Sequence, residues 1–364
     1  MRIAYVIPQL NFGGAQTMLS RLLRGMEQSK YEIRLFICSA QLNNSIESEI
    51  AKAGIQCTFL NISENATGIK KIINKIKAYI IFKNALNKYD PDIIHNHLDN
   101  FYSFIYCILN HKKLIFTIHS WPDRLAFPKM KRYLKALYKK DNIYLVGVAN
   151  SVSEQAYKVL LDKKEVITTI YNPIEINKYY HIGHEDDVFD YIHVGRLTPI
   201  KDQRLLIKAF SMVIAKFPKS KLLIVGDGEL RVELEAFARE CNVDEQVFFL
   251  GNRSDIPELL SVSDAFVLSS KSEACPVTVL EAMASGLPVI STNVGAVYEQ
   301  LGTDRLLVEP GNVDELAKKM ILIQEDSKLF EYIVEQEKFR IQDFAVERIV
   351  QQHCDLYKKV IDGN

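Results

Sequence analysis

Short runs rich in β-branched and aromatic residues alternate along this chain with longer segments whose apolar residues recur at helical spacing. In the first half, strands are predicted at residues 2–8, 33–39, 57–60, 92–97, 114–119 and 144–149. In the second half, strands are predicted at residues 190–197, 221–226, 246–251, 265–268 and 305–308. Amphipathic helices are predicted between them, among them 15–26, 69–86, 313–324 and a final helix at 344–361. This alternation predicts an α/β fold built on doubly wound parallel sheets.

The charge is divided unevenly between the two halves of the chain. Its 364 residues, 48% hydrophobic and 25% charged, are typical of a soluble globular protein with room for two domains. The net charge is zero, yet residues 1–172 carry 24 Lys and Arg against 13 Asp and Glu, a balance of +11, and residues 173–364 carry −11. This asymmetry predicts a boundary near residue 172 and a first half that faces something anionic.

The cysteines and the apolar runs indicate the compartment. The six cysteines form no CxxC pair, which favours free thiols in a reducing, cytosolic setting. No signal peptide precedes the first strand, and no apolar run approaches the ~20 residues needed to span a bilayer. We therefore expect a cytoplasmic protein.

The segment 265–290 carries the most specific pattern in the chain. A buried strand ends near Leu268, Pro276 suits the first position of a helix, and Gly286 suits its C-terminal cap. Glu273 therefore lies in a loop at the carboxyl end of a strand, and Glu281 in the early turns of the helix that follows. Ligands bind at that edge of an open α/β sheet, and a helix N-terminus there favours a phosphate. Because carboxylates accept hydrogen bonds from hydroxyls, the combination predicts a ligand with both phosphate and polyol, such as a nucleotide sugar.

A second cluster of candidate residues follows the strand at 190–197. Gly195 allows a ligand to approach the backbone, Arg196 ends the strand, and Lys201 is predicted in the first turn of the next helix. An Arg and a Lys that converge beside a helix N-terminus can clamp a diphosphate. The alternative is a structural Arg–carboxylate pair with an exposed Lys.

The spacing of Glu273 and Glu281, followed by the sequence AMASGLPV, resembles the retaining group 1 glycosyltransferases of the glycogen-synthase-like family numbered four. The resemblance implies the GT-B fold, with two Rossmann-like domains and the site in the cleft between them. It implies an acceptor domain at 1–172, a nucleotide-sugar donor domain at 173–343, and a C-terminal helix at 344–364 that crosses back to the first domain. The segment Asn172-Pro-Ile-Glu175 resembles the hinge of this family.

The resemblance also implies roles for single residues. Glu273 would lie at the donor sugar and Glu281 at the ribose hydroxyls, while Arg196 and Lys201 would bind the diphosphate. His119, at the end of a strand, would contact donor sugar hydroxyls near the reaction centre. The remaining donor-binding residues that the resemblance implies are Gly14, Asn252, Arg253, Cys275, Pro276 and Val277. Relatives commonly have an aromatic residue in place of Cys275 and a Gly in place of Ala274. For Gly14 and its neighbour, a plain tight turn is the alternative.

The remaining polar motifs favour no metal site. His95 and His97 alternate along a strand and point to one face, which can be half of a metal site, but no third ligand is evident. Asp90-Pro-Asp92 has the form of a metal-binding DxD motif, yet its Pro and its place before a strand favour a turn. We expect neither a metal nor a cofactor, because Arg196 and Lys201 would supply the positive charge.

Two predicted helices, at 69–88 and 129–140, are rich in lysine and contain no acid. A lysine run usually marks a solvated helix face. Such a face can also dock on anionic lipid, with about 1 kcal/mol for each basic residue near the headgroups. The basic first half favours peripheral association with the inner face of a membrane.

We interpret the chain as a retaining glycosyltransferase that moves a sugar from a nucleotide-diphosphate donor, with UDP as the favoured base, to an acceptor hydroxyl. A lipid-linked saccharide of surface polysaccharide synthesis is the favoured acceptor by resemblance, and no nucleic-acid partner is expected. Two alternatives stay open: a nucleotide-sugar epimerase of the same fold, and a non-catalytic partner of another glycosyltransferase.

Overall fold

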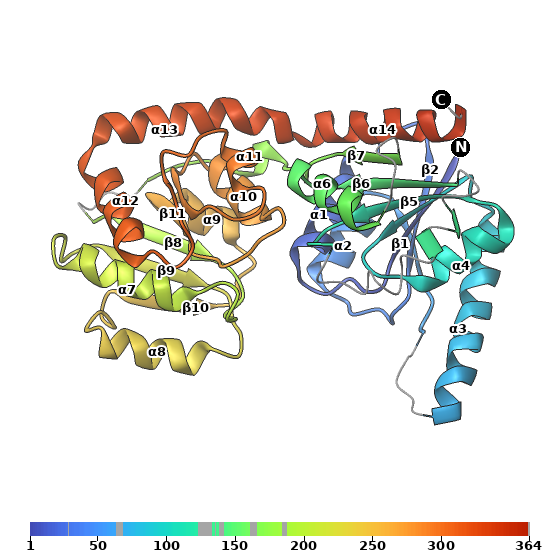
Figure 1. The fold of residues 1–364 in the computed structure, drawn as a ribbon, viewed down its shortest axis with the longest axis horizontal. Helices are drawn as coiled ribbons and strands as arrows, with labels where there is room; N and C mark the ends of the chain where they lie inside the picture. Colours follow the sequence, from blue (N-terminus) through green and yellow to red (C-terminus); the bar gives the residue numbers. More distant parts are fainter. Residues whose placement is uncertain are drawn as a thin grey trace. The chain divides into compact units, whose positions relative to one another are not determined.

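The computed structural model describes residues 1–27, 29–62, 68–122, 133–134, 136–137, 142–160, 166–183 and 188–362. The chain divides into two compact units. One contains Met1–Pro173 together with Val346–Asn364, and the other contains Ile174–Ala345. Each unit is built on its own parallel sheet with helices over its faces (Figure 1). The predicted fold class is therefore confirmed.

The first unit contains a seven-stranded sheet of order β3-β2-β1-β4-β5-β6-β7, in which all pairs are parallel. Its strands are β1 (Arg2–Ile7), β2 (Glu32–Ile37), β3 (Gln56–Phe59), β4 (Ile93–His97), β5 (Lys113–Ile118), β6 (Ile143–Gly147) and β7 (Ile167–Thr169). The helices described around it are α1 (Gly14–Gly25), α2 (Ser45–Lys52), α3 (Gly68–Tyr89), α4 (Phe101–Asn110), α6 (Asn150–Leu160) and α14 (Val346–Asp362).

The second unit contains a six-stranded parallel sheet of order β10-β9-β8-β11-β12-β13. Its strands are β8 (Asp190–Val194), β9 (Lys221–Val225), β10 (Val247–Gly251), β11 (Ala265–Leu268), β12 (Val289–Thr292) and β13 (Leu307–Val308). Its α-helices are α7 (Gln203–Ile214), α8 (Arg231–Glu240), α9 (Ile256–Ser261), α10 (Val277–Ala284), α11 (Val297–Leu301), α12 (Val313–Glu325) and α13 (Ser327–Arg340). Two short 3-10 helices, η2 (Ile176–Lys178) and η3 (Ile341–Phe344), lie near its two ends.

Each sheet has a point where the strand order reverses. In the first sheet it lies between β1 and β4, and in the second between β8 and β11. At such a point the loops after the two central strands diverge to opposite faces of the sheet, which leaves a crevice at the carboxyl edge. The loops that carry the candidate residues of the second unit follow β8 and β11, so the topology brings them together.

The C-terminal helix α14 belongs to the core of the first unit. Its buried side chains, among them Ile349, Tyr357 and Val360, pack with the apolar residues of β1 and α1. The phenol oxygens of Tyr357 and Tyr5, on β1, form a hydrogen bond. The second predicted basic helix, 129–140, lies outside the described residues except for 133, 134, 136 and 137.

Candidate active site

Two strand-to-helix loops form the candidate site of the second unit. β8 and β11 are neighbours in the sheet, with Ala265 beside Tyr191 and Phe266 beside Ile192. Arg196 and Lys201 follow β8, and Glu273 follows β11. The backbone N–H of Lys271 donates to the carbonyl oxygen of Ile200, 2.8 Å away, which ties the two loops together.

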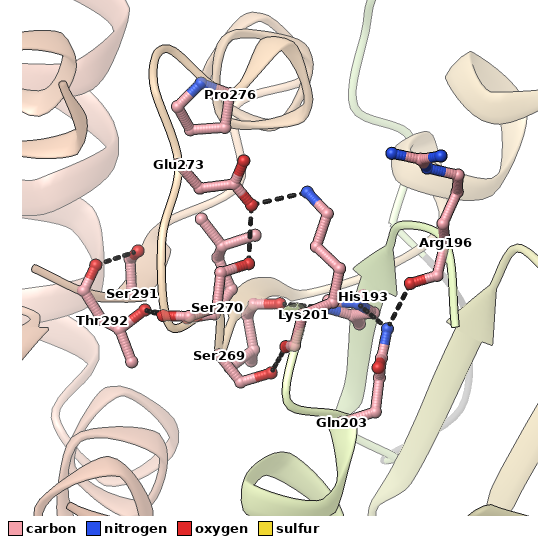
Figure 2. A network of polar contacts seen from close by, with 12 residues as sticks. His193, Arg196, Lys201, Gln203, Ser269, Ser270, Glu273, Pro276, Ser291 and Thr292 are labelled. Atoms are coloured by element: carbon pink, nitrogen blue, oxygen red, sulfur yellow. Dashed lines mark hydrogen bonds and ion pairs between the residues drawn. The ribbon is translucent and has the colours of Figure 1, made fainter. Parts of the chain in front are cut away.

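Lys201 and Glu273 form an ion pair at this edge. Lys201 Nζ lies 2.5 Å from Glu273 Oε1, and the hydroxyl of Ser270 donates to the same oxygen at 2.6 Å (Figure 2). The two charged side chains are only 18% and 13% exposed. A cation and a hydroxyl thus contact this shielded carboxylate, which offsets part of the cost of burying it.

The prediction that Lys201 lies in the first turn of a helix is wrong. Helix α7 begins at Gln203, and Asp202 before it adopts a left-handed backbone, with φ of +50°. A residue in this conformation cannot be part of a right-handed helix, so α7 does not extend to Lys201. Lys201 is therefore part of the loop, where the hydroxyl of Ser269 donates to its carbonyl oxygen at 2.9 Å.

A buried hydrogen-bond chain fixes the backbone at Arg196. Burial lowers the pKa of His193 to about 4, so its ring is neutral at pH 7. Its Nδ1–H donates to the carbonyl of Val267 at 2.9 Å, which leaves Nε2 to accept from the Gln203 side chain at 3.2 Å. The second N–H of that amide donates to the carbonyl of Arg196 at 2.9 Å. The strand end is thus held in place while the guanidinium of Arg196 extends away from these residues (Figure 2).

Two glycines support these loops, and their role could not be predicted from spacing alone. A Cβ on Gly226 would lie 2.1 Å from the carbonyl oxygen of Gly195. A Cβ on Gly295 would lie 2.1 Å from the carbonyl oxygen of Glu273 and 2.8 Å from that of Ala274. Both glycines have positive φ, +127° and +58° respectively. Only glycine allows the supporting backbone to approach the two loops so closely.

Helix α10 presents its N-terminus to the same edge. Pro276 is its N-cap and the helix begins at Val277, one residue later than predicted. Pro276, Val277 and Cys275 are all buried, so the backbone rather than these side chains faces a ligand. The free N–H groups of the first turn favour an anion there.

Glu281 lies on the second turn of α10 and is 8% exposed. Its Oε1 accepts a hydrogen bond from the hydroxyl of Tyr179, 3.3 Å away. Tyr179 follows η2 and was not among the predicted site residues, so its contact with Glu281 was missed. No periodicity or motif marked it, because the contact joins residues 102 positions apart.

Asn252 and Arg253 follow β10 and are exposed. The guanidinium of Arg253 forms an ion pair with the carboxylate of Asp255. This pairing raises the pKa of Arg253 above its ordinary value and lowers that of Asp255. The exposed Arg253 side chain thus has an acidic partner two residues along the chain.

In the first unit, the loop after β1 leads into α1, which begins at Gly14 behind an extended Gly13. His119 follows β5, and its Nε2 lies 3.0 Å from Nδ1 of His97, the last residue of β4. Burial lowers the pKa of His119 to about 3 and that of His97 well below its ordinary value, so both rings are neutral at pH 7. His97 therefore orients His119 and restricts its tautomer.

His95 and His97 lie on one face of β4, as predicted, with ring centroids 4.4 Å apart and ring planes tilted by 34°. His95 is bonded on both sides at 2.8 Å, to the hydroxyls of Tyr357 and Thr117. Within the described ranges, no group of three or more His, Cys, Asp or Glu side chains is arranged to hold a metal ion. Asp90 of the DxD-like sequence is paired with Arg2 and Lys112.

Taken together, the second unit offers two cations and a helix N-terminus for an anion, with two shielded carboxylates for hydroxyl groups. Residues 180–339 match the family described as glycosyl transferases group 1, and residues 12–178 match glycosyltransferase family 4. The chain is a group 1 glycosyltransferase of the GT-B fold.

Relatives of this glycosyltransferase come from both domains of prokaryotic life. An uncharacterized glycosyltransferase of Methanocaldococcus jannaschii is 31% identical, and the match spans 60% of this chain and 59% of that protein. The Escherichia coli UDP-Gal:alpha-D-GlcNAc-diphosphoundecaprenol alpha-1,3-galactosyltransferase is 26% identical over 90% of this chain and 89% of its own. Among solved structures, Anabaena HepE in complex with UDP and glucose superposes with a TM-score of 0.81 at 19% identity, covering 99% of this chain and 100% of HepE.

Proposed function

We propose that this glycosyltransferase moves a sugar from a UDP-sugar to an acceptor hydroxyl, with retention of the anomeric configuration. The observation that carries the proposal is the meeting of Lys201 and Glu273 at the point where the strand order of the second sheet reverses. Support for UDP comes from the UDP bound by HepE and from the UDP-galactose donor named for the E. coli relative.

The diphosphate is the group that Arg196 and Lys201 are proposed to bind. As the bond to the sugar breaks, negative charge accumulates on the diphosphate, and fixed cations beside the N-terminus of α10 stabilise it. Lys201 then exchanges its carboxylate partner for a phosphate oxygen. These cations supply the charge that a divalent metal would otherwise supply, so no metal is included in the proposal.

The carboxylates are proposed to contact the two sugars of the donor. When Lys201 turns to the diphosphate, Glu273 keeps its hydrogen bond from Ser270 and accepts from donor sugar hydroxyls. A carboxylate at that place also stabilises positive charge that develops at the anomeric carbon. Glu281, held by Tyr179, accepts from the ribose hydroxyls. His119 is the proposed further contact to the donor sugar, oriented by His97.

A lipid-linked saccharide is the proposed acceptor. The E. coli relative acts on a sugar linked to diphosphoundecaprenol, and a Salmonella typhimurium relative is a lipopolysaccharide galactosyltransferase. The balance of +11 in residues 1–172 supports a location on the cytoplasmic face of an anionic membrane, through the basic segments 69–88 and 129–140.

The clamp is tested by substitution. Arg196→Ala and Lys201→Ala each remove a charged hydrogen bond worth about 1.5–3 kcal/mol, so each should weaken UDP binding roughly 10–100-fold in calorimetry. UMP, which lacks the second phosphate, should lose much less. Arg204→Ala is the control, because Arg204 is an exposed cation of the same unit, paired with Glu233. Unchanged UDP affinity in both clamp variants would remove the proposed diphosphate site, and sugar isomerisation in the absence of acceptor would indicate an epimerase instead.

A further inference from the structure

Helix α10 begins without a side-chain cap. The start of a helix is usually fixed by a Ser, Thr, Asp or Asn at the N-cap, whose side chain accepts from backbone N–H groups of the first turn. The N-cap of α10 is Pro276, which makes no such hydrogen bond. The N–H groups of the first turn are therefore left to a ligand, and other contacts have to hold the start of this helix in place.

A neighbouring segment, residues 295–301, supports the loop that leads into α10. The N–H of Ala296 donates to the carbonyl oxygen of Ala274, 2.9 Å away. The backbone of Gly295 leaves no room for a Cβ beside the carbonyl oxygen of Glu273. The rest of the segment forms α11, which packs against both α10 and α13 (Figure 1).

The side chain of Gln300, on α11, reaches the start of α10 itself. Its Nε2 donates to the carbonyl oxygen of Pro276 at 3.0 Å. A carbonyl oxygen has two lone pairs, so this oxygen can accept from Gln300 together with the first hydrogen bond inside the helix. Because the bond is made to a carbonyl, it occupies none of the N–H groups that a phosphate would contact.

The amide of Gln300 is buried but incompletely hydrogen-bonded. The residue is 0% exposed, and its Oε1 accepts no hydrogen bond within the described part of the chain. A buried acceptor without a partner is destabilising, and an apolar side chain of similar size would avoid that cost. The contribution of Gln300 to stability therefore does not account for an amide at this place, whereas its contact with Pro276 does.

Arg340, the last residue of α13, anchors α11. Its Nε donates to the carbonyl oxygen of Gln300 at 3.3 Å, and its Nη2 donates to that of Glu299 at 2.6 Å. Both carbonyls lie in the last turn of α11, where no partner is available inside the helix. The guanidinium is itself paired with Asp343. Gln300 is thus held through its backbone while its side chain bonds to Pro276.

We propose that Gln300 is a positioning residue of the diphosphate site and that Arg340 acts through it. The bond from Gln300 fixes the start of α10, so that the N–H groups of its first turn face the phosphates. Without this bond the helix start is free to move, and those N–H groups lose their alignment. The inference deepens the proposed function, on which it rests, because these are the phosphates that Arg196 and Lys201 are proposed to bind.

The test compares UDP with uridine, which has the same base and ribose but no phosphate. Gln300→Met keeps the length of the side chain and removes its donor. Its affinity for UDP in calorimetry should fall about tenfold, roughly the contribution of one charged hydrogen bond. Its affinity for uridine in an NMR titration should not change. In urea unfolding, the variant should be at least as stable as the wild type, because the unpartnered Oε1 is gone.

Two further variants examine the anchor and provide a control. Arg340→Ala should also weaken UDP binding, Arg340→Lys should restore part of it, and Gln300→Met/Arg340→Ala should bind UDP little worse than Gln300→Met, because both residues act through one contact. Gln324→Met is the control. Gln324, on α12, accepts from the hydroxyl of Tyr191 and bonds to that of Ser220. This control should lose stability and bind UDP like the wild type.

Unchanged UDP affinity in Gln300→Met would overturn the proposal. An equal loss of UDP and uridine affinity, together with a loss of stability like that of Gln324→Met, would also overturn it, because that is the pattern of a structural residue. Additive losses in the double variant would remove Arg340 from the proposal. A wild-type chain that binds no UDP would contradict the proposed function and this inference with it, whereas UDP binding that is lost in Arg196→Ala and kept in Gln300→Met would contradict this inference alone.

Discussion

Gly295→Ala is predicted to disable the site without unfolding the chain. The added Cβ would lie 2.1 Å from the carbonyl oxygen of Glu273, more than about 1 Å short of van der Waals contact. The added Cβ would meet backbone atoms, which cannot rotate away as the end of a side chain can. The loop that carries Glu273 therefore has to move by about 1 Å. A misplacement of that size near a reacting centre costs about 100-fold in rate.

Gly311→Ala is the matched control for backbone strain. Gly311 lies in the same unit with a φ of +86°, and a Cβ there would have no neighbour within 4 Å. Both variants incur the cost of an alanine with positive φ, about 1–2 kcal/mol. Only Gly295→Ala adds the contact with the Glu273 loop.

The assay is the turnover of UDP-sugar with a saccharide acceptor, together with urea unfolding of each variant. Gly295→Ala should lose about 100-fold in kcat, and Gly311→Ala should turn over close to the wild type. Because of its added contact, Gly295→Ala should also lose about 1–3 kcal/mol more stability than Gly311→Ala. Equal turnover in the two variants would refute the inference that Gly295 positions Glu273.

Three further predictions concern buried polar groups. His97→Leu should lower kcat about tenfold by leaving His119 without its partner, and His97→Asn, whose amide can reach the same nitrogen, should restore part of it. Tyr179→Phe should raise the KM for the donor several-fold with little change in kcat, since it weakens a contact that holds Glu281 in both ground and transition states. Burial raises the pKa of Glu337 from its ordinary value of 4.5 to about 8, so the folded chain holds a proton that the unfolded chain loses above pH 4.5. The free energy of unfolding should therefore fall by about 3 kcal/mol between pH 4.5 and pH 7, at 1.36 kcal/mol per pH unit. In urea unfolding, Glu337→Gln should lack this part of the pH dependence of stability, because its amide does not titrate.

The alternation of strands and helices was enough to predict two parallel sheets, because the spacing of apolar residues is a local property. The order of the strands is not local, and it is what makes Lys201 and Glu273 neighbours. The resemblance placed both residues at a donor site, but only the adjacency of β8 and β11 shows that they form an ion pair. The turn at Asp202 was mispredicted because a left-handed residue interrupts a sequence that otherwise continues the helix.

Contacts between distant segments account for most of what was missed. His95 and His97 were predicted to share a face, but Tyr357, the partner of His95, lies 262 residues later in the chain. The lysines of α3 could be read from the sequence, whereas the exposure of its isoleucines depends on how the helix packs. No sequence motif marked Gly295 or Tyr179. The role of Gly295 depends on how closely its backbone approaches that of Glu273, and the role of Tyr179 depends on its contact with Glu281, 102 residues later in the chain.

The central claim is that Arg196, Lys201, Glu273 and Glu281 together hold the donor nucleotide. A crystal structure of this chain with UDP tests it most directly. We predict that the second phosphate lies within hydrogen-bond distance of Arg196 and Lys201, that Lys201 has left Glu273, and that the ribose hydroxyls contact Glu281. UDP bound at a place that none of these four side chains contacts would contradict the account.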